Sequence, residues 1–172
     1  MSEKLMRLGD IFDVVYGINL ELVHLTQCKS TDIGAIPFVS RTESNNGVSA
    51  FVESELDIDP NPAHTLSVAA GGSVLATFYQ PFPYYSGRDL YVLIPLGEKN
   101  IIEMIFYAQC ISANKYKYNY GRQANKTLRD IMIPMEMPKI LQENLIQKQE
   151  SIIKTVQSYL NKSLVIKKRI IF

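Results

Sequence analysis

The stretch Lys115–Lys126, KYKYNYGRQANK, holds the residue types best suited to contact nucleic acid. Its three tyrosines stand at alternate positions, so a strand would place the three rings on one face. After Gly121 come an arginine, a glutamine, an asparagine and a lysine, whose side chains pair well with guanine, adenine and phosphate. The pattern predicts a strand and a turn that touch DNA. It also fits an ordinary edge strand followed by a solvated basic turn.

Length and composition favour one folded domain with an appended element. The chain has 172 residues, of which 47% are hydrophobic and 20% are charged, as in ordinary folded proteins. Residues 1–138 carry 11 Lys and Arg against 15 Asp and Glu, whereas residues 139–172 carry 7 against 2. A DNA-binding protein needs a local basic footprint rather than a basic average. Here the footprint would be residues 115–129, which hold five basic residues and no acidic one before position 130.

Motifs for catalysis or for cofactor binding are not found in the sequence. Cys28 and Cys110 stand far apart and there are only two histidines, so we expect neither a zinc site nor a disulfide framework. A glycine-rich dinucleotide loop and a Walker loop are missing, so we expect no cofactor and a chain that is not an enzyme. The acidic segment Glu53–Pro62 could hold a metal ion, but a solvated loop explains it more simply. No secretory signal and no apolar run of about 20 residues is visible, which predicts a cytoplasmic protein.

Short apolar runs separated by turn residues predict a compact mixed α+β domain over residues 1–138 with few helices. The Pro-rich stretch 80–88 and the glycine doublet at 71–72 should be a loop and a turn. Strands are expected at 35–40, 48–52, 65–70, 73–79, 90–95, 115–120 and 127–134, and helices at 5–16 and 101–114.

The last part of the chain predicts one long coiled-coil helix over residues 139–172. No Pro or Gly occurs from Lys139 to Lys168. The positions at alternating spacings of four and three from Leu145 to Ile166 are apolar except at Gln149 and Ser163. A bare apolar face is unfavourable in water, and a helix of about 30 residues is about 45 Å long, so we expect it to pair with a second helix. The residues expected to make this dimer are Leu145, Ile152, Val156, Tyr159, Leu160 and Ile166.

The order of segments resembles a known family. IPFVSRTESNNG comes first, then AGGSVLATFYQPFPYYSGRDLYVL, then KYKYNYGRQANKTLRDIMIP, and then a helix that begins with LQENLI. This order is similar to the target recognition domain of the DNA specificity subunits of restriction-modification systems, of type I and the related types IIB and IIG. The resemblance covers most of residues 5–150.

The resemblance implies a recognition subunit without catalytic activity. Such a subunit binds one half of a bipartite target in double-stranded DNA and docks onto methyltransferase subunits, which use S-adenosylmethionine themselves. A restriction subunit can join the complex. The long helix would separate recognition domains and help to dock the methyltransferase.

The chain has room for one recognition domain and one helix, whereas the common subunit has two of each. We therefore expect a half-subunit whose helices pair two copies into a homodimer, which would bind a two-fold symmetric, interrupted site. Three alternatives stay open. The chain could be one module of a longer subunit, a fragment of a single-chain restriction-methyltransferase enzyme, or a helical interaction adaptor that does not bind DNA.

Three sets of residues are carried over from the matching stretches as DNA contacts. Other roles are open for some of them and for their neighbours: the asparagines could only build a turn, Phe78 could be core, Arg88 could pair with Asp89, and Tyr116 could pack against helix 101–114. The first set is Arg41, Thr42, Asn45 and Asn46. The second is Thr77, Tyr79, Gln80, Tyr84, Tyr85, Ser86 and Arg88. The third is Lys115, Tyr118, Asn119, Tyr120, Arg122, Gln123, Asn125 and Lys126.

Overall fold

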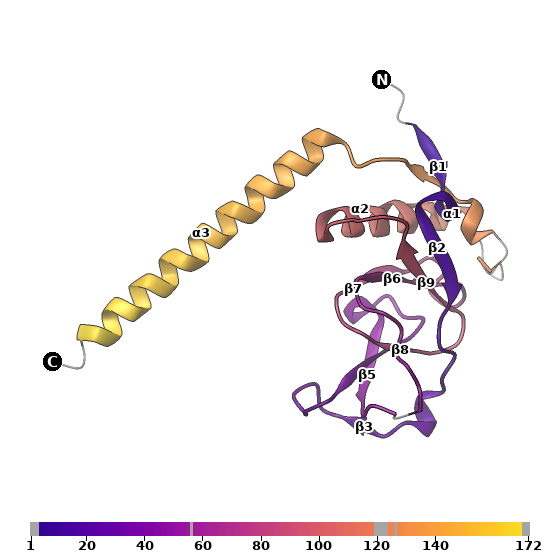
Figure 1. The fold of residues 1–172 in the computed structure, drawn as a ribbon, viewed down its shortest axis with the longest axis horizontal. Helices are drawn as coiled ribbons and strands as arrows, with labels where there is room; N and C mark the ends of the chain where they lie inside the picture. The colour runs from indigo at the N-terminus through magenta and orange to yellow at the C-terminus, as the bar shows by residue number, and fades with distance from the viewer. Residues whose placement is uncertain (1–3, 56, 119–123, 126, 170–172) are drawn as a thin grey trace. The chain divides into compact units, whose positions relative to one another are not determined.

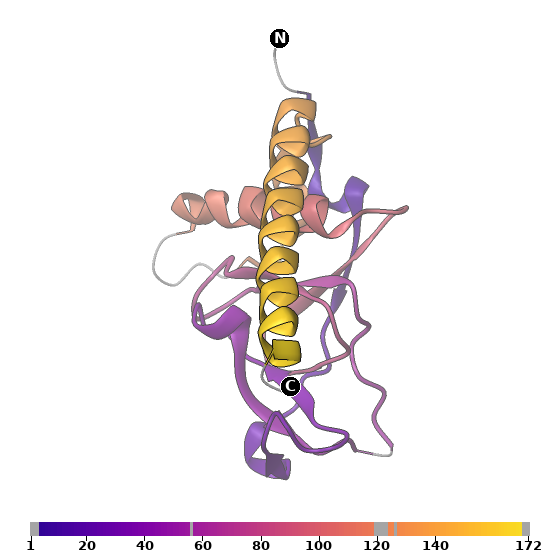
Figure 2. The same cartoon turned by 90° about the vertical axis from the view of Figure 1, so that its left-hand side faces the viewer.

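The computed structural model describes residues 4–55, 57–118, 124–125 and 127–169. It divides into two compact units, Met1–Glu136 and Met137–Phe172 (Figure 1). The first unit mixes short strands with few helices, which confirms the predicted α+β class. In Figures 1 and 2, helix α2 and strands β3 and β5 lie at opposite ends of this unit.

A four-stranded antiparallel sheet, ordered β2-β9-β6-β7, forms the centre of the first unit. All five residues of β6 are buried, because this strand has a neighbour on each side and side chains packed on both faces. On one face, Phe12 from β2 meets Tyr107 from α2 edge to face, with 5.4 Å between ring centroids. The bounds are β2 Phe12–Tyr16, β6 Thr65–Ala69, β7 Thr77–Gln80, β9 Leu90–Pro95 and α2 Ile101–Ser112.

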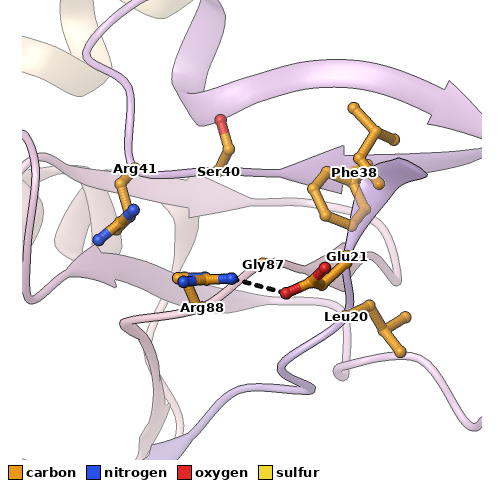
Figure 3. Close-up of a pocket in the computed structure, with 8 residues that line it drawn as sticks. Leu20, Glu21, Phe38, Ser40, Arg41, Gly87 and Arg88 are labelled. Atoms are coloured by element: carbon orange, nitrogen blue, oxygen red, sulfur yellow. Dashed lines mark hydrogen bonds and ion pairs between the residues drawn. The ribbon is translucent and has the colours of Figure 1, made fainter. Parts of the chain in front are cut away.

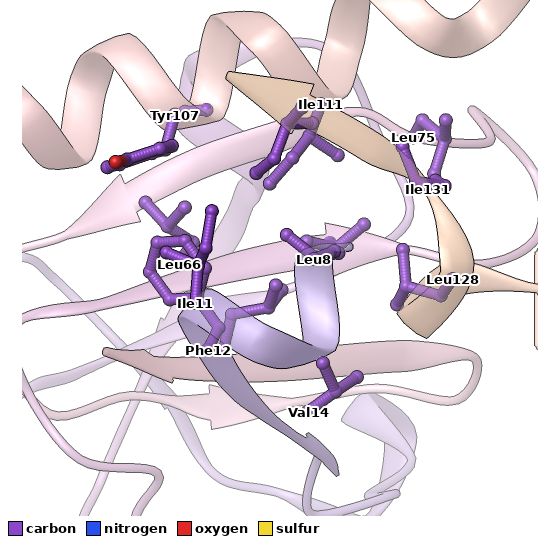
Figure 4. Packing of buried hydrophobic residues seen from close by; sticks show 14 of the residues in the cluster. Leu8, Ile11, Phe12, Val14, Leu66, Leu75, Tyr107, Ile111, Leu128 and Ile131 are labelled. Atoms are coloured by element: carbon purple, nitrogen blue, oxygen red, sulfur yellow. The ribbon is translucent and has the colours of Figure 1, made fainter. Parts of the chain in front are cut away.

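Helix α2 begins at a capping box. The Asn100 side chain accepts from the backbone N–H of Glu103 at 3.0 Å, and the Glu103 carboxylate accepts from the backbone N–H of Asn100 at 2.9 Å. Ile111 on its inward face packs with Leu8 and Leu66 in the main hydrophobic core (Figure 4). Each large side chain buried there contributes roughly 1.5–3 kcal/mol. This core therefore holds the central sheet and α2 together as one body.

A second four-stranded sheet, ordered β3-β5-β4-β8, continues the unit. Strand β4 pairs antiparallel with β5 and parallel with β8. Tyr85 in β8 and its neighbour Tyr84 are fully buried, and these adjacent residues belong to two different smaller cores. The bounds are β3 Gln27–Cys28, β4 Ile36–Val39, β5 Val48–Val52 and β8 Tyr85–Ser86.

A two-stranded ribbon joins the start of the unit to its end. Strand β1 (Leu5–Arg7) pairs antiparallel with β10 (Met132–Pro134). The four-residue helix α1 (Leu8–Ile11) follows β1, and it packs under the 3-10 turn Leu128–Asp130. Leu8 donates its backbone N–H to Ile131 O at 2.8 Å, so both ends of the unit are closed on the same core.

Several predicted elements are wrong or shorter than expected. The helix over 5–16 exists only at α1, because Phe12 and Val14 point inward at the period of a strand that pairs with β9. The strand over 115–120 is wrong in its described part: Ala113–Lys117 is a 3-10 helix, and Tyr116 is 77% exposed rather than packed against α2. Strand 73–79 begins only at Thr77, loop 80–88 contains β8, and strand 127–134 is a 3-10 turn followed by β10.

The second unit is the helix α3, Lys139–Arg169. Apolar side chains such as Leu145, Ile152 and Val156 are exposed on it. The side chains of Tyr159, Leu160 and Ile166 lie outside those that the structure describes. Within the described part of the chain, no helix is long and apolar enough to cross a membrane.

Candidate nucleic-acid interface

The turn between β6 and β7 is bonded to described residues in or next to each of the three segments that hold the predicted contacts. Ala70 donates its backbone N–H to Asp89 O at 2.8 Å and accepts from the N–H of Ala124 at 3.0 Å. Ser73 donates its N–H to Arg41 O at 3.4 Å. Residues 70–73 of this turn are therefore bonded to all three segments, although the segments lie tens of residues apart in the sequence.

An ion pair between Arg41 and Asp89 fastens the first segment to the second. Nη1 of Arg41 lies 2.5 Å from Oδ2 of Asp89, and the side chains are 36% and 21% exposed. The Tyr16 hydroxyl accepts from the backbone N–H of Asp89 at 2.8 Å, which holds this residue at a φ of 56°. The alternative that Arg88 pairs with Asp89 is therefore wrong, since Arg41 takes the carboxylate. Arg88 pairs with Glu21 instead.

Two glycines leave room for this ion pair. A Cβ atom at Gly71 would lie 3.3 Å from both Arg41 Nη1 and Asp89 Oδ2. At Gly72, where φ is +64°, a Cβ atom would lie 3.1 Å from the Cβ of Arg41. The glycine doublet is thus a turn, as predicted, and it is also the surface against which the Arg41 side chain lies.

The remaining residues of the first set form an exposed turn. Asn45 and Asn46 have φ angles of 50° and 52°, which asparagine tolerates better than most residues. The Asn45 side chain donates to Val48 O at 3.1 Å, and Thr42 Oγ1 accepts from the N–H of Ser44 at 3.2 Å. Both asparagines therefore build the turn, and they remain exposed on its surface.

Most of the second set is buried, which corrects the prediction of direct contact. Burial leaves their side chains no access to a duplex in this structure, and their polar atoms instead bond to other parts of the fold. Gln80, for example, donates to Asn46 O at 3.0 Å and to Ser67 Oγ at 2.9 Å, so it supports the first turn from below. The buried residues are Thr77, Gln80, Tyr84, Tyr85 and Ser86.

Buried tyrosines also fasten the acidic loop. The Tyr85 hydroxyl accepts from the N–H of Glu55 at 3.0 Å and lies 3.0 Å from Ile58 O, to which it can donate. Burial raises the pKa of the Tyr84 hydroxyl well above its usual value. Among the described residues, no group of three or more His, Cys, Asp or Glu could hold a metal ion.

Two members of the second set remain accessible. The Tyr79 hydroxyl lies 2.5 Å from Nδ1 of His64, and partial burial raises its pKa. Arg88 lines a pocket of about 230 Å³ together with Arg41, and its Nη2 lies 2.6 Å from Oε1 of Glu21 (Figure 3). The pocket thus places two guanidinium groups and one carboxylate side by side.

The third set is described only in part. Lys115 forms an ion pair with Glu43 of the first segment, and the Tyr118 hydroxyl lies 2.9 Å from Thr127 Oγ1. Asn125 is exposed, and its backbone carbonyl accepts from the Tyr91 hydroxyl at 3.4 Å. Five members lie outside the described residues: Asn119, Tyr120, Arg122, Gln123 and Lys126.

Sequence reasoning missed the acidic partners of these cations. Glu21, Glu43 and Asp89 each contact a predicted cation that lies 67, 72 or 48 positions away. No spacing rule links residues so distant, because their proximity depends on the pairing of strands. The sequence signal for these ion pairs was a general one: the candidate interface is basic, and acidic residues that could pair with its cations occur elsewhere in the chain.

The sequence matches the family of the type I restriction modification DNA specificity domain over residues 3–171. The chain belongs to this family. Among curated proteins, it is 30% identical over 129 residues to the specificity subunit S.BcgI of a type II restriction enzyme from Heyndrickxia coagulans. That match takes in 74% of this chain and 35% of the relative.

Solved structures of specificity subunits share the fold of this DNA specificity domain. The S subunit of a type I system from M. genitalium matches with a TM-score of 0.58 and 18% identity, over 91% of this chain and 42% of that one. The HsdS subunit from Thermoanaerobacter tengcongensis matches with a TM-score of 0.56 and 16% identity, over 90% and 38%. The chain therefore spans well under half the length of the relatives that it matches.

Proposed function

We propose that this chain is a DNA sequence-recognition module of a restriction-modification system, without catalytic activity of its own. It binds one half of a bipartite target and directs a methyltransferase, and where present an endonuclease, to that site. S-adenosylmethionine binds the partner methyltransferase rather than this chain. Membership of the DNA specificity family supports this role, which would place the chain in the cytoplasm with the chromosome.

The convergence of three distant segments on one turn is the observation that carries the proposal. Sequence recognition needs several side chains held in one register against base edges, with cations placed for the phosphates. The hydrogen bonds at Ala70 and Ser73 and the Arg41–Asp89 ion pair hold the three segments in a fixed position relative to one another. Long loops alone would lose this register.

We assign the predicted contacts to two groups by their burial and propose a different role for each group. The five buried side chains position the loops, as Gln80 does beneath Asn46. The accessible ones are proposed to touch DNA: Arg41, Thr42, Asn45, Asn46, Tyr79, Arg88, Lys115, Tyr118 and Asn125. On the sequence alone, Asn119, Tyr120, Arg122, Gln123 and Lys126 join them.

Helix α3 is proposed to pair with α3 of a second copy as a coiled coil and to help dock the methyltransferase. The exposed apolar side chains at 145, 152 and 156 follow the spacing of a coiled-coil seam. Two copies related by a two-fold axis would bind a symmetric target interrupted by a spacer.

Co-expression with the methyltransferase encoded beside it, followed by mapping of methylated adenines in the host genome, tests this function. We expect a gapped, two-fold symmetric motif that disappears when this chain is omitted. An asymmetric gapped motif would keep the recognition role and reject the homodimer. Methylation by the partner alone at the same sites would reject the recognition role, and methyl transfer by this chain alone would identify it as an enzyme fragment.

A further inference from the structure

Two cations at the candidate interface are held by exposed carboxylates. Arg88 pairs with Glu21, with side chains 61% and 52% exposed, and Lys115 pairs with Glu43, with side chains 40% and 57% exposed. Each of these two cations is therefore already paired with a carboxylate before any phosphate arrives.

These two pairs differ from the Arg41–Asp89 pair. Exposed ion pairs are weak, because water and salt screen them, so another anion can replace the carboxylate readily. Asp89 is less exposed than Glu21 and Glu43 and is also held through its backbone N–H. A DNA phosphate can therefore replace the carboxylate partner of Arg88 or of Lys115, whereas Arg41 keeps its pairing with Asp89.

We propose that Glu21 and Glu43 are specificity-determining residues that act by suppressing binding to non-target DNA. In the free chain each carboxylate occupies the cation that would otherwise attract any phosphate. On a target sequence, base contacts hold the backbone close enough for phosphates to displace both carboxylates. This inference rests on the proposed function and adds a mechanism of discrimination to it.

The physical basis is the salt-dependent part of DNA affinity, which is shared by all sequences. Each phosphate neutralised by a protein cation adds a salt-dependent contribution, and this contribution supplies nearly all non-specific binding. A carboxylate that competes for the cation reduces this general attraction. Discrimination then improves even though neither glutamate needs to touch a base.

The test measures the affinity of the full chain for a random-sequence duplex across a range of salt concentrations. We expect Glu21→Gln and Glu43→Gln each to raise that affinity roughly threefold and to steepen its log–log salt slope by about 0.9. Affinity for duplexes that the wild-type chain has enriched from a random pool should not fall in either variant and should rise by less than about threefold, so that the ratio of enriched to random affinity falls; an equal rise on both kinds of duplex would overturn the inference. Combining Glu43→Gln with Lys115→Gln should cancel the gain, because the freed cation is then removed.

Asp10→Asn is the matched control. It removes one exposed carboxylate from a surface ion pair, that of Asp10 with Arg7, outside the three segments. An equal gain in Asp10→Asn would show that net charge alone is responsible and would overturn the inference. So would unchanged random binding in both glutamine variants, or a loss of affinity for the enriched duplexes, which would mark the glutamates as base contacts to cytosine. If the wild-type chain enriches no sequence, the proposed function fails, while the random duplex still decides the role of the glutamates.

Discussion

Asp89 is expected to affect DNA recognition without touching DNA, because it holds one of the proposed contacts in place. Its carboxylate holds Arg41, its carbonyl accepts from Ala70, and its N–H donates to Tyr16. Asp89→Asn removes the charge but keeps a residue that tolerates a φ of 56°. We expect the free energy of unfolding to fall by about 1 kcal/mol, because the pair is only half-buried.

The same variant should bind its enriched duplexes about tenfold more weakly, since Arg41 and the 41–46 turn lose their anchor. Urea unfolding and fluorescence anisotropy measure the two effects. Asp10→Asn breaks an exposed pair of the same kind outside the three segments and should change neither by as much. Full affinity in Asp89→Asn would show that the backbone hydrogen bonds alone position Arg41.

Gly72 lies directly beneath the Arg41 side chain. A matched pair of alanine variants tests whether this close contact matters for DNA binding. Gly72 and Gly34 both have positive φ angles, +64° and +81°, so alanine strains the backbone at both. Only at Gly72 would the new Cβ crowd a neighbour, at 3.1 Å from Arg41 Cβ. Gly72→Ala should therefore weaken binding to enriched duplexes as well as lower the melting temperature, whereas Gly34→Ala should only lower the melting temperature. Equal DNA affinity in both variants would contradict this.

At the scale of elements, buried aromatic residues position the loop 80–88 between the two sheets. Tyr84 sits in a short bridge with Asn61, which also donates from its side chain to Tyr84 O at 3.0 Å. Thr65 Oγ1 lies 3.4 Å from the Tyr84 hydroxyl, a long and weak hydrogen bond. The loop is therefore held mainly by hydrogen bonds to its backbone and by the burial of its tyrosine rings. The backbone of Arg88, at the end of the loop, is held in place in the same way.

Tyr84 also predicts how stability depends on pH. Burial raises its folded-state pKa above the unfolded value of about 10. As pH rises above about 10, the unfolded chain loses this proton while the folded chain keeps it, so stability falls by up to about 1.4 kcal/mol per pH unit. Tyr84→Phe lacks this proton. Urea unfolding of both proteins from pH 8 to 11 should show the variant less stable at pH 8 and gaining on the wild type above pH 10. A difference in unfolding free energy that stays constant from pH 8 to 11 would show that Tyr84 ionises in the folded protein as it does in the unfolded chain.

At the scale of the whole molecule, the proposed function depends on what covers the apolar side of α3. Ile152 lies in the predicted seam, whereas Ile140 lies outside it, and both are exposed. Ile152→Asp should raise the dimer dissociation constant roughly 100-fold or more, because two apolar side chains leave the seam and two charges enter it. Ile140→Asp should leave the constant nearly unchanged. Sedimentation equilibrium measures both, and a wild-type chain that stays monomeric at high concentration would reject the pairing.

The local sequence was sufficient for the strands and turns that depend on near neighbours. Strands at 35–40, 48–52, 65–70 and 90–95 were recognisable because apolar and β-branched residues are bounded by turn residues. Helix α2 was recognisable from its spacing, and its capping box sits within four residues. The order of the segments was also enough to indicate the family, because the motifs that carry the resemblance are visible in the sequence itself.

Only the tertiary structure decided which predicted contacts are accessible and which are supports. Tyr84, Tyr85 and Gln80 have the residue types of an interface, yet the fold turns them inward, where the Gln80 amide and the Tyr85 hydroxyl bond to distant turns and loops. In the same way, Lys115 meets Glu43 only because the chain brings segments 72 positions apart together. Residue type and spacing describe what a side chain can do, whereas access and partners follow from contacts between distant segments, which no local pattern encodes.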